Sequence, residues 1–494
     1  MTLQSLLALK SGTDVRGTAL GSSPDLTDEV VQSIVRAFLY RVAGRIGKKR
    51  ITVAVGHDSR LSAKRISDAA ISAAVASGAD VLFTGLSSTP SMFMILQEKD
   101  YGADCSVMIT ASHMPSDKNG LKFFLPDGGL EGKDVAEILT FASEGKTLSG
   151  EGTVKRIDYM TRYAAMLVDK VRAATGEDKP LSGKKIVVDA GNGAGGFYVD
   201  KVLKPLGADT EGSQFLEPDG AFPNHIPNPE NAAAMRAICD CVKRTGADFG
   251  IIFDTDVDRA GAVDKNGEEI NRNKLIALIS AILLREREGG TIVTDSVTSD
   301  GLSEFITKHK GVHRRFKRGY KNVIDEAKRL NAEGIYSPLA IETSGHAALK
   351  ENYFLDDGAY LVTRILISVA RDSDITSLIS DLPLPAEEAE ARLPFADGAD
   401  FKELGKQVLD QLEGSVPETA GLTLSENSFE GVRINFDKEN GDGWALVRMS
   451  LHEPIMPVNF ESDAKGGTKI IAEKLYTLLK GYRFLNTDIL KKFF

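Results

Sequence analysis

The chain has 494 residues, of which 42% are hydrophobic and 26% charged, and its formal net charge is −10. This length is too great for one hydrophobic core, so we expect a globular protein of three or four domains. The acidic balance argues against nucleic acid or an anionic membrane surface as the main partner.

The sequence carries no sign of secretion or of a membrane span. No apolar stretch approaches the roughly 20 residues that a transmembrane helix needs, and nothing basic precedes the short apolar run at 6–9. The three cysteines are an odd count that argues against a disulfide framework, and Cys239 and Cys241 lack the second pair of a structural zinc site. We therefore expect a cytoplasmic protein, whose oligomeric state, monomer or dimer, is left open.

The first segment alternates strands and helices. A β-branched run at 51–55 predicts a strand, a helical pattern follows over 66–79, and 81–83 predicts another strand. This alternation predicts a doubly wound α/β layer. A Gly- and Ser-rich stretch at 145–153 indicates the first domain boundary.

A polar loop joins two apolar runs later in this segment. The runs at 105–109 and 121–125 predict short buried strands. The loop between them contains residues that suit irregular backbone, namely Pro115, Asp117, Asn119 and Gly120. The layout places Ser112 and His113 at the end of a strand, where open α/β sheets bind ligands. Taken alone, Ser112 is more simply a helix N-cap or a solvated hydroxyl.

Two further segments repeat this design. Strands are predicted at 185–190 and 249–253 in the second segment and at 291–294 and 338–341 in the third, and a polar loop follows each of them. The composition then changes, because 382–390 is rich in Pro and Glu and is typical of a linker.

The last segment has a different pattern. The runs at 431–436 and 444–448 flank a polar, Gly-containing turn and predict a β-hairpin, and 464–479 predicts an amphipathic helix. This segment is therefore expected to be α+β.

Asp254, Asp256 and Asp258 place three carboxylates at alternate positions directly after a predicted strand. An EF-hand is excluded because its sixth and twelfth positions hold Arg259 and Lys265 instead of Gly and Glu. A charged turn with Asp caps is the simpler alternative. However, three carboxylates this close repel one another unless a cation lies among them, which favours a hard divalent ion such as Mg²⁺.

A glycine pattern, Gly191-x-Gly-x-x-Gly196, follows the strand at 185–190. With Asp209 and Glu211 downstream it matches a dinucleotide-binding fingerprint and would indicate an oxidoreductase. Any tight strand-to-helix turn favours glycine, so a plain turn is the preferred interpretation.

Three further stretches carry polar groups that suit a phosphorylated sugar. Glu342-Thr-Ser-Gly-His346 can hydrogen-bond vicinal hydroxyls, although helix capping explains it equally well. The stretch from Arg448 to Pro454 can hold a phosphate, with a surface arginine as the alternative. Lys317-Arg-Gly-Tyr-Lys321 adds positive charge, and Arg16 lies near the start of the chain, where a structural salt bridge is the alternative.

Together these stretches resemble the α-D-phosphohexomutase superfamily, most closely its phosphomannomutase/phosphoglucomutase branch, over nearly the full chain. Ser112-His113 with its turn and Lys122 resembles the phosphoserine loop, residues 254–259 resemble the metal loop, and 342–346 resemble the sugar-specificity loop. The resemblance implies three successive α/β domains and a C-terminal α+β (TATA-box-binding-protein-like) domain around a central cleft. We place these domains at 1–148, 149–265, 266–382 and 383–494.

The resemblance also implies an activity and a set of site residues. A phosphoserine would interconvert hexose 1-phosphate and hexose 6-phosphate, of glucose or mannose, through a hexose 1,6-bisphosphate that also acts as activator. The implied catalytic residues are Ser112, His113, Lys122 and Arg16. One Mg²⁺ would be bound by Ser112, Asp254, Asp256 and Asp258. The implied substrate-binding residues are Arg259, Lys317, Gly319, Tyr320, Glu342, Ser344, His346, Arg448, Ser450 and His452.

The sequence departs from the family pattern in three loops. The last-domain loop usually reads Arg-Pro-Ser-Gly-Thr-Glu-Pro, and here Met449, Leu451 and His452 replace Pro, Gly and Thr. The metal loop carries Thr255 and Val257 where Gly is usual, and Met114 replaces an Asn. Weaker phosphate retention would suit a glucose 1,6-bisphosphate synthase that uses the same phosphoserine. A non-catalytic regulatory relative is a further alternative.

Overall fold

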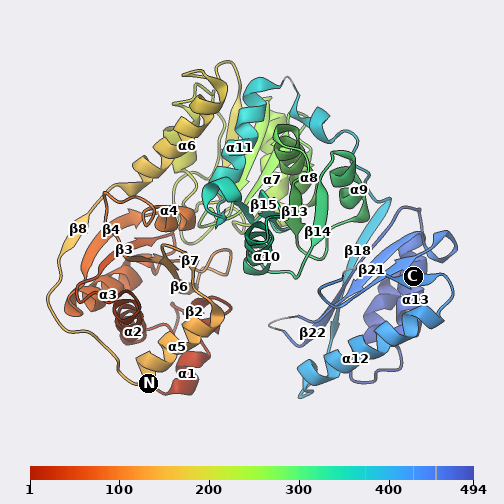
Figure 1. Ribbon diagram of the computed structural model, residues 1–494, viewed down its shortest axis with the longest axis horizontal. Helices are drawn as coiled ribbons and strands as arrows, with labels where there is room; N and C mark the ends of the chain where they lie inside the picture. The colour runs from red at the N-terminus through yellow and green to blue at the C-terminus, as the bar shows by residue number, and fades with distance from the viewer. Residues whose placement is uncertain (373, 427, 451–452) are drawn as a thin grey trace. The chain divides into compact units, whose positions relative to one another are not determined.

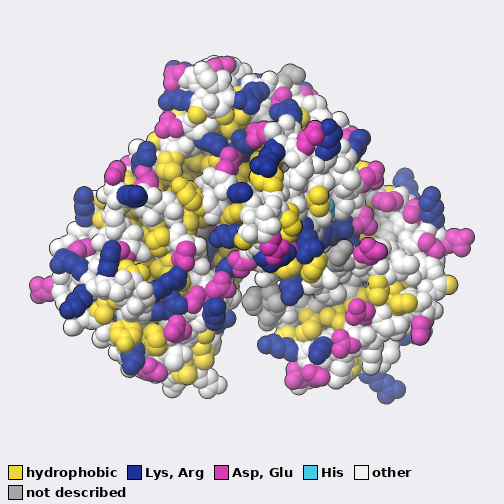
Figure 2. Space-filling model, in the orientation of Figure 1, with side chains coloured by type: hydrophobic (Ala, Val, Ile, Leu, Met, Phe, Trp, Pro, Cys, Tyr) yellow, Lys and Arg dark blue, Asp and Glu magenta, His cyan; other side chains and the backbone are white. Residues whose placement is uncertain are grey.

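The computed structural model describes residues 1–494 except 373, 427 and 451–452. It divides into two compact units. Unit 1 comprises Met1–Asn271 and Ser344–Thr376, and unit 2 comprises Arg272–Thr343 and Ser377–Phe494. Among the described residues, no helix combines the length and apolarity that a bilayer crossing requires. Basic and acidic side chains are interspersed over the visible surface (Figure 2).

The first sheet of unit 1 has the strand order β1-β2-β6-β5-β3-β4-β8, with β7 paired to β6. Its strands are β1 (Lys10–Ser11), β2 (Asp14–Thr18), β3 (Thr52–His57), β4 (Asp80–Leu86), β5 (Cys105–Ile109), β6 (Lys118–Leu125), β7 (Gly128–Gly129) and β8 (Val154–Arg156). The pairs β3–β4, β3–β5 and β4–β8 are parallel, whereas β6 runs antiparallel to both β5 and β2.

Helices cover both faces of this sheet (Figure 1). On one face, α2 (Asp28–Ile46), α3 (Ala63–Ala76) and α5 (Gly132–Ser143) bury their apolar sides against the strands, beside the short α1 (Leu3–Leu7). Helix α4 (Thr89–Met94) lies on the other face. The strands expected near 51–55, 81–83, 105–109 and 121–125 are present as β3, β4, β5 and β6, and the helix expected at 66–79 is α3. β8 joins the sheet beyond residue 148, while the four-domain boundaries stay a prediction.

The second sheet of unit 1 has the order β12-β11-β10-β9. Its strands are β9 (Ile186–Asp189), β10 (Phe249–Phe253), β11 (Ala260–Asp264) and β12 (Glu269–Ile270). The first two are parallel, and β11 turns back antiparallel to β10, so the loop at 254–259 is a tight connection between neighbouring strands. The predicted strands at 185–190 and 249–253 are thus confirmed.

Helices and one hairpin complete unit 1. Helix α7 (Ala232–Thr245) packs on β9, β10 and β11, and α6 (Tyr159–Thr175) packs beside α11 (Gly358–Arg371). A π-helical turn covers Val199–Leu203, and a 3₁₀ turn at Lys350–Asn352 joins β16 (Ala347–Leu349) to the antiparallel β17 (Leu355–Asp356).

Unit 2 contains three parallel strands in the order β14-β13-β15 and a separate antiparallel sheet. The parallel strands are β13 (Thr291–Thr294), β14 (Val312–Arg315) and β15 (Leu339–Ile341), accompanied by α8 (Asn273–Glu286), α9 (Asp300–Lys308) and α10 (Tyr320–Ala332). The strands predicted at 291–294 and 338–341 are therefore present.

The antiparallel sheet of unit 2 has the order β18-β22-β21-β20-β19. Its strands are β18 (Glu387–Pro394), β19 (Leu422–Leu424), β20 (Val432–Phe436), β21 (Gly443–Val447) and β22 (Ile455–Ser462), and α12 (Phe401–Ser415) and α13 (Gly467–Leu479) share its apolar core. Short 3₁₀ turns occur at Ile375–Ile379, Val416–Glu418, Lys438–Asn440 and Thr487–Phe493. The predicted hairpin is present as β20 and β21, and the predicted terminal helix as α13.

The linker prediction at 382–390 is wrong at its C-terminal end. From Glu387 onward the chain forms β18, which pairs with β22 along its whole length. Residues on this edge strand alternate, so that Ala391 and Leu393 are buried while Glu388 and Glu390 are exposed. The acidic residues occupy the solvent face of an edge strand, a placement that also discourages edge-to-edge pairing with another chain.

Candidate active site

Ser112 lies in the tight loop that leaves β5, and its backbone has the left-handed conformation, with φ of 51°. Its N–H donates to Thr110 Oγ1 over 2.8 Å. The side chain is buried, and Oγ donates to Asp254 Oδ2 over 3.1 Å. The loop after β5 (residues 110–117, the serine loop) and the loop after β10 (residues 254–259, the aspartate loop) are therefore in direct contact within unit 1.

The aspartate loop lies between β10 and β11 and holds three buried carboxylates, those of Asp254, Asp256 and Asp258. One oxygen from each lies within 4.8 Å of the others. Burial raises the pKa of Asp254 well above its usual range, and the Asp258 and Asp256 carboxylates raise it further. Burial also opposes ionisation of Asp258, but the charges of Lys122, His346 and Arg259 outweigh it and lower the pKa of that carboxyl.

This donor set fits a hard divalent cation. The Oδ1 atoms of Asp256 and Asp258 are buried and have no hydrogen-bond partner among the described residues. Buried carboxylate oxygens without a hydrogen-bond partner are costly, and oxygen-only sites of this kind suit Mg²⁺. The fit rests on this chemistry of the donors and on their convergence.

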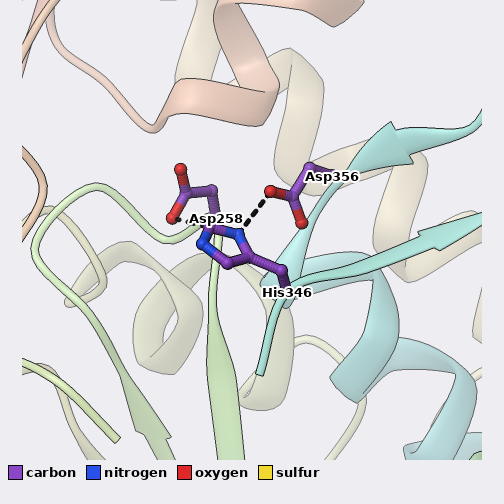
Figure 3. A group of neighbouring side chains, drawn as sticks. All are labelled: Asp258, His346 and Asp356. Carbon is purple, nitrogen blue, oxygen red and sulfur yellow. Dashed lines mark hydrogen bonds and ion pairs between the residues drawn. The ribbon is translucent and has the colours of Figure 1, made fainter. Parts of the chain in front are cut away.

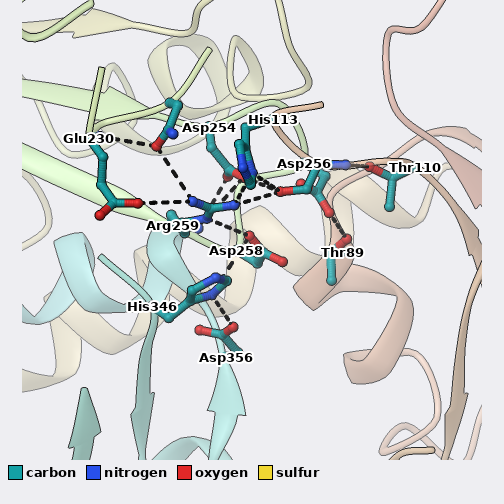
Figure 4. Close-up of polar contacts among 12 residues, drawn as sticks. Thr89, Thr110, His113, Glu230, Asp254, Asp256, Asp258, Arg259, His346 and Asp356 are labelled. Carbon is teal, nitrogen blue, oxygen red and sulfur yellow. Dashed lines mark hydrogen bonds and ion pairs between the residues drawn. The ribbon is translucent and has the colours of Figure 1, made fainter. Parts of the chain in front are cut away.

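Two neighbours hold the carboxylates in place. Lys122, on β6, lies with Nζ 2.5 Å from Asp258 Oδ2 and 3.4 Å from Asp256 Oδ2. Thr89, the first residue of α4, donates its hydroxyl to Asp256 Oδ2 and its backbone N–H to Asp256 O over 2.8 Å (Figure 4). The sequence analysis missed Thr89, because nothing distinguishes it locally from any residue at a helix start.

Arg259 lies at the centre of the polar contacts drawn in Figure 4. Its guanidinium is buried and donates to Ser112 Oγ over 2.9 Å and to His113 Nδ1. It also forms ion pairs with Asp254 at 3.7 Å and Glu230 at 3.7 Å. A fixed positive charge therefore lies directly against the serine hydroxyl.

His113 is a neutral acceptor in this arrangement. Burial lowers the pKa of His113 to about 3, with further contributions from the Arg259 and Arg16 charges. Arg16 itself lies on β2 opposite Gly120 and forms a salt bridge of 2.9 Å with Asp14, as the structural alternative anticipated. A Cβ at Gly120 would lie 2.3 Å from Val15 O, so this close approach requires glycine.

His346 also joins this group (Figure 3). Its Nδ1 donates to Asp356 Oδ2 and lies 4.0 Å from Asp258 Oδ1. Burial lowers the pKa of His346, but the Asp356 and Asp258 carboxylates overcome this, so that the pKa is raised. The sequence analysis missed Asp356. The only local signal was its position beside Asp357, which caps α11.

The glycine run after β9 packs against the aspartate loop. A Cβ at Gly193 would lie 2.6 Å from Thr255 O, and Ala194 N donates to the same oxygen over 2.8 Å. A Cβ at Gly195 would meet the Phe253 ring at 3.0 Å. These glycines provide close packing within the protein, which agrees with the plain-turn interpretation.

The remaining implied site residues belong mostly to unit 2. The boundary between the units falls between Thr343 and Ser344, so the 342–346 stretch is shared. In unit 2, Glu342 is buried and its Oε1 accepts from Gly319 N over 2.6 Å, while Lys317 is exposed and Tyr320 begins α10. In unit 1, Ser344 is buried.

Arg448 and Ser450 lie in the connection between β21 and β22 of unit 2. Arg448 is only 8% exposed, and its Nε is buried with no hydrogen-bond partner among the described residues. Burial lowers the pKa of this arginine, and the nearby Arg318 charge lowers it further. Ser450 Oγ accepts from Glu453 N over 3.2 Å. His452 lies outside the described residues.

Three family models match successive parts of the chain. They describe the α/β/α domains I, II and III of phosphoglucomutase/phosphomannomutase and match residues 9–147, 161–267 and 271–384. Together these matches cover well over half of the chain.

Individual proteins are similar over almost the full length. A phosphoglucomutase/phosphomannomutase of Thermococcus kodakarensis is 31% identical over 91% of this chain and 94% of its own. A phosphomannomutase/phosphoglucomutase of Pseudomonas putida is 30% identical over 86% of this chain and 87% of its own. The crystal structure of a phosphoglucomutase/phosphomannomutase family protein from Burkholderia thailandensis aligns with a TM-score of 0.82 at 27% identity, covering 98% of both chains.

Proposed function

The chain belongs to the phosphoglucomutase/phosphomannomutase family and is therefore a phosphohexomutase, and we propose that it interconverts the 1- and 6-phosphates of glucose or mannose through a phosphoryl group carried on Ser112. The contact between Ser112 Oγ and Asp254 carries this proposal. It brings a candidate nucleophile to three carboxylates and a buried arginine, the elements that phosphoryl transfer requires.

The proposed reaction has two transfers in opposite directions. In the first, the bond between phosphorus and Ser112 Oγ breaks, and a free hydroxyl oxygen of the hexose phosphate forms the new bond to phosphorus. That hydroxyl gives its proton to a base of the protein, and Ser112 Oγ takes up a proton. The resulting hexose 1,6-bisphosphate then turns over and returns its other phosphoryl group to Ser112.

The side chains around Ser112 suit these steps. Arg259, 2.9 Å from Oγ, can stabilise the charge of the phosphoserine. His346, held by Asp356, is the best candidate for the base, and Lys122 can supply a proton or a charge. His113 is neutral and already accepts from Arg259, so an orienting role suits it better.

Mg²⁺ is the proposed cofactor, bound by Asp254, Asp256, Asp258 and Ser112, and the family is Mg²⁺-dependent. When bound, the ion offsets negative charge on the transferring phosphoryl group.

In unit 2, Glu342 is proposed to accept hydrogen bonds from sugar hydroxyls, while Arg448 and Ser450 hold the phosphate that does not react. The Nε of Arg448 is buried and has no hydrogen-bond partner in the part of the chain that the structure describes, which supports an anion at that position. A catalytic bisphosphate synthase is a second candidate, favoured by the changed residues of the same loop, such as Met449, since weaker retention would release the bisphosphate.

Intact-mass spectrometry tests the phosphoserine. After incubation with glucose 1,6-bisphosphate and Mg²⁺, the wild-type chain should gain one phosphoryl group, and the Ser112→Ala variant should gain none. Equal labelling of both would refute the assignment. Mixing the phosphorylated wild-type chain with glucose 1-phosphate in a single turnover then separates the two activities, because a mutase releases glucose 6-phosphate and keeps its phosphoserine, whereas a synthase releases one bisphosphate for each phosphoserine consumed.

A further inference from the structure

Arg60 lies beneath the serine loop, and its side chain is fully buried. It lies three residues beyond the end of β3, and its hydrogen bonds to the described residues of the loop all go to main-chain oxygens. The guanidinium donates four hydrogen bonds to this loop and the start of β6. NH2 donates to Ser112 O over 2.5 Å and to Met114 O over 2.6 Å, and NH1 donates to Pro115 O over 2.7 Å and to Lys118 O over 2.8 Å.

A fully buried guanidinium needs a compensating charge, and Asp58 supplies it. Asp58 Oδ2 lies 3.3 Å from Arg60 Nε, and Asp58 Oδ1 accepts from Arg60 N over 2.9 Å. The backbone N–H of Asp58 donates to Ile109 O at the end of β5, and the guanidinium carbon lies 5.4 Å from the Phe222 ring centroid. Contacts outside the serine loop, with Asp58 and Phe222, therefore also fix the position of Arg60.

The serine loop depends on such support for two reasons. Ser112 has a positive φ, a conformation that costs a non-glycine residue on the order of 1 kcal/mol and persists only where its surroundings impose it. In addition, the carbonyl groups of residues 112–115 lie outside the strands of the sheet and need donors. Arg60 supplies donors to three of them, those of Ser112, Met114 and Pro115, and to Lys118 O at the start of β6.

We infer that Arg60 is a positioning residue for phosphoryl transfer: its guanidinium fixes the serine loop so that Ser112 Oγ points at the three aspartates. The inference rests on the proposed function of Ser112. Arg60 touches neither the serine hydroxyl nor the aspartates by any hydrogen bond between described side chains, so its effect is exerted through the backbone of the loop.

Arginine is required for this geometry. Its planar fork directs several N–H groups at fixed angles, and here two nitrogens serve four carbonyls. A lysine carries the same charge on one nitrogen with three N–H groups, so it can satisfy only part of the set. Displacing a reacting atom by about 1 Å can cost roughly 100-fold in rate, so partial support should reduce catalysis more than stability.

The test compares Arg60→Lys with a matched control, Arg65→Lys. Arg65 lies on α3 and also donates to main-chain oxygens, Ala19 O and Leu26 O, but among the described residues it makes no hydrogen bond with the serine loop. For Arg60→Lys we expect a folded protein whose kcat falls about 10- to 100-fold with KM within about 3-fold of wild type. The rate at which glucose 1,6-bisphosphate phosphorylates Ser112, followed by intact mass, should fall by the same factor. Arg65→Lys should stay within about 2-fold in both rates.

A phosphorylation rate of Arg60→Lys equal to wild type would overturn the inference. So would an equal loss of rate in Arg60→Lys and Arg65→Lys that parallels the fall in their melting temperatures. Should Arg60→Lys fail to fold, Asp58→Asn decides the question. It keeps the shape and the Oδ1 acceptor but removes the charge that orients the guanidinium, so kcat should fall about 3- to 10-fold at unchanged KM. Wild-type kinetics in that folded variant would reject the inference. Failure of the wild-type chain itself to accept phosphate would instead refute the proposed function.

Discussion

The hydroxyl of Ser112 and a carboxylate oxygen of Asp254 lie 3.1 Å apart, although 142 positions separate the two residues in the chain. Each residue lies just after a strand, Ser112 three residues beyond β5 and Asp254 directly after β10. Two successive α/β layers thus contribute one group each to a shared cluster. The carboxyl ends of parallel strands are the usual place for such convergence.

Replacing Ser112 by Ala should abolish mutase activity while leaving the fold intact. The hydroxyl forms hydrogen bonds with Asp254 and Arg259, and its loss should cost about 1 kcal/mol of unfolding free energy or less. Coupled assays of glucose 6-phosphate formation and thermal unfolding measure the two effects. The control is Ser33→Ala on α2. It also removes a hydroxyl hydrogen bond, the one that Ser33 donates to Ala142 O, and should retain full activity. Residual turnover in Ser112→Ala would rule out a covalent phosphoserine.

Removing the divalent cation should stop turnover, and adding Mg²⁺ should restore it and raise the melting temperature. A ligand at 100 times its Kd stabilises the folded state by about 2.7 kcal/mol. Asp256→Asn should lose most of this stabilisation because it removes one of the three converging charges. The exposed Asp240→Asn serves as control and should behave like wild type. An Mg²⁺-induced shift of equal size in Asp256→Asn would mean that the ion binds elsewhere.

Arg448→Ala should raise KM for hexose phosphates at least 10-fold, since a charge-assisted contact to phosphate contributes roughly 1.5–3 kcal/mol. Phosphorylation of Ser112 by a saturating bisphosphate should change much less, because Arg448 belongs to the loop between β21 and β22. Steady-state kinetics at several substrate concentrations measure the change. The exposed Arg483→Ala is the matched control. An unaltered KM in Arg448→Ala would place the phosphate site elsewhere.

Glu461 should make the last sheet less stable as pH rises. Its carboxylate accepts a hydrogen bond from Trp444 Nε1 over 2.9 Å, and the Arg433 guanidinium lies over the face of the Trp444 ring. Burial raises the pKa of Glu461 to about 7, although Trp444 and Arg433 lower it. Because the folded-state pKa exceeds the unfolded value, the folded state prefers the protonated form. The contribution of the Glu461 carboxyl to folding stability is therefore fully present below about pH 4.3 and is lost as pH rises through 7.

Glu461→Gln removes this titration and keeps an acceptor for Trp444. Relative to wild type, the variant should gain unfolding free energy steadily from pH 5 to pH 8, up to about 3 kcal/mol. Thermal unfolding of both proteins over this range measures the difference. The exposed Glu439→Gln should show a constant offset across the range. A pH-independent difference for Glu461→Gln would show that its carboxyl titrates normally.

Local patterns predicted much of the fold. Strands such as β5 and β10 are short, fully buried apolar runs that end in polar residues. Such a continuous hydrophobic run is visible in the sequence without knowledge of tertiary contacts. β18 was mistaken for a linker because its acidic residues occupy one exposed face, a pattern that depends on the partner strand. Composition alone cannot distinguish these cases.

The candidate site was predictable where its residues lie in one short stretch, as with Asp254, Asp256 and Asp258. Thr89, Asp356 and Arg60 were not, because each acts through a partner distant in sequence. Thr89 contacts Asp256 across 167 positions, and Arg60 contacts Ser112 O across 52. A hydroxyl, a carboxylate or an arginine beside a helix start or a strand end has many ordinary explanations, and only the tertiary contacts select among them.

The packing of Gly193 against Thr255 gives the glycine run an influence on the aspartate loop, the proposed cation site. In a saturation mutagenesis experiment, substitutions at Gly193 should reduce activity in the same way as substitutions of Asp254, Asp256 and Asp258. Substitutions at the residues next to Gly193 in the sequence should not. Variants at Gly193 would remain abundant in the cell yet require more magnesium in the growth medium. A screen that varies magnesium supply would thereby reveal residues that support the loop without contributing a ligand.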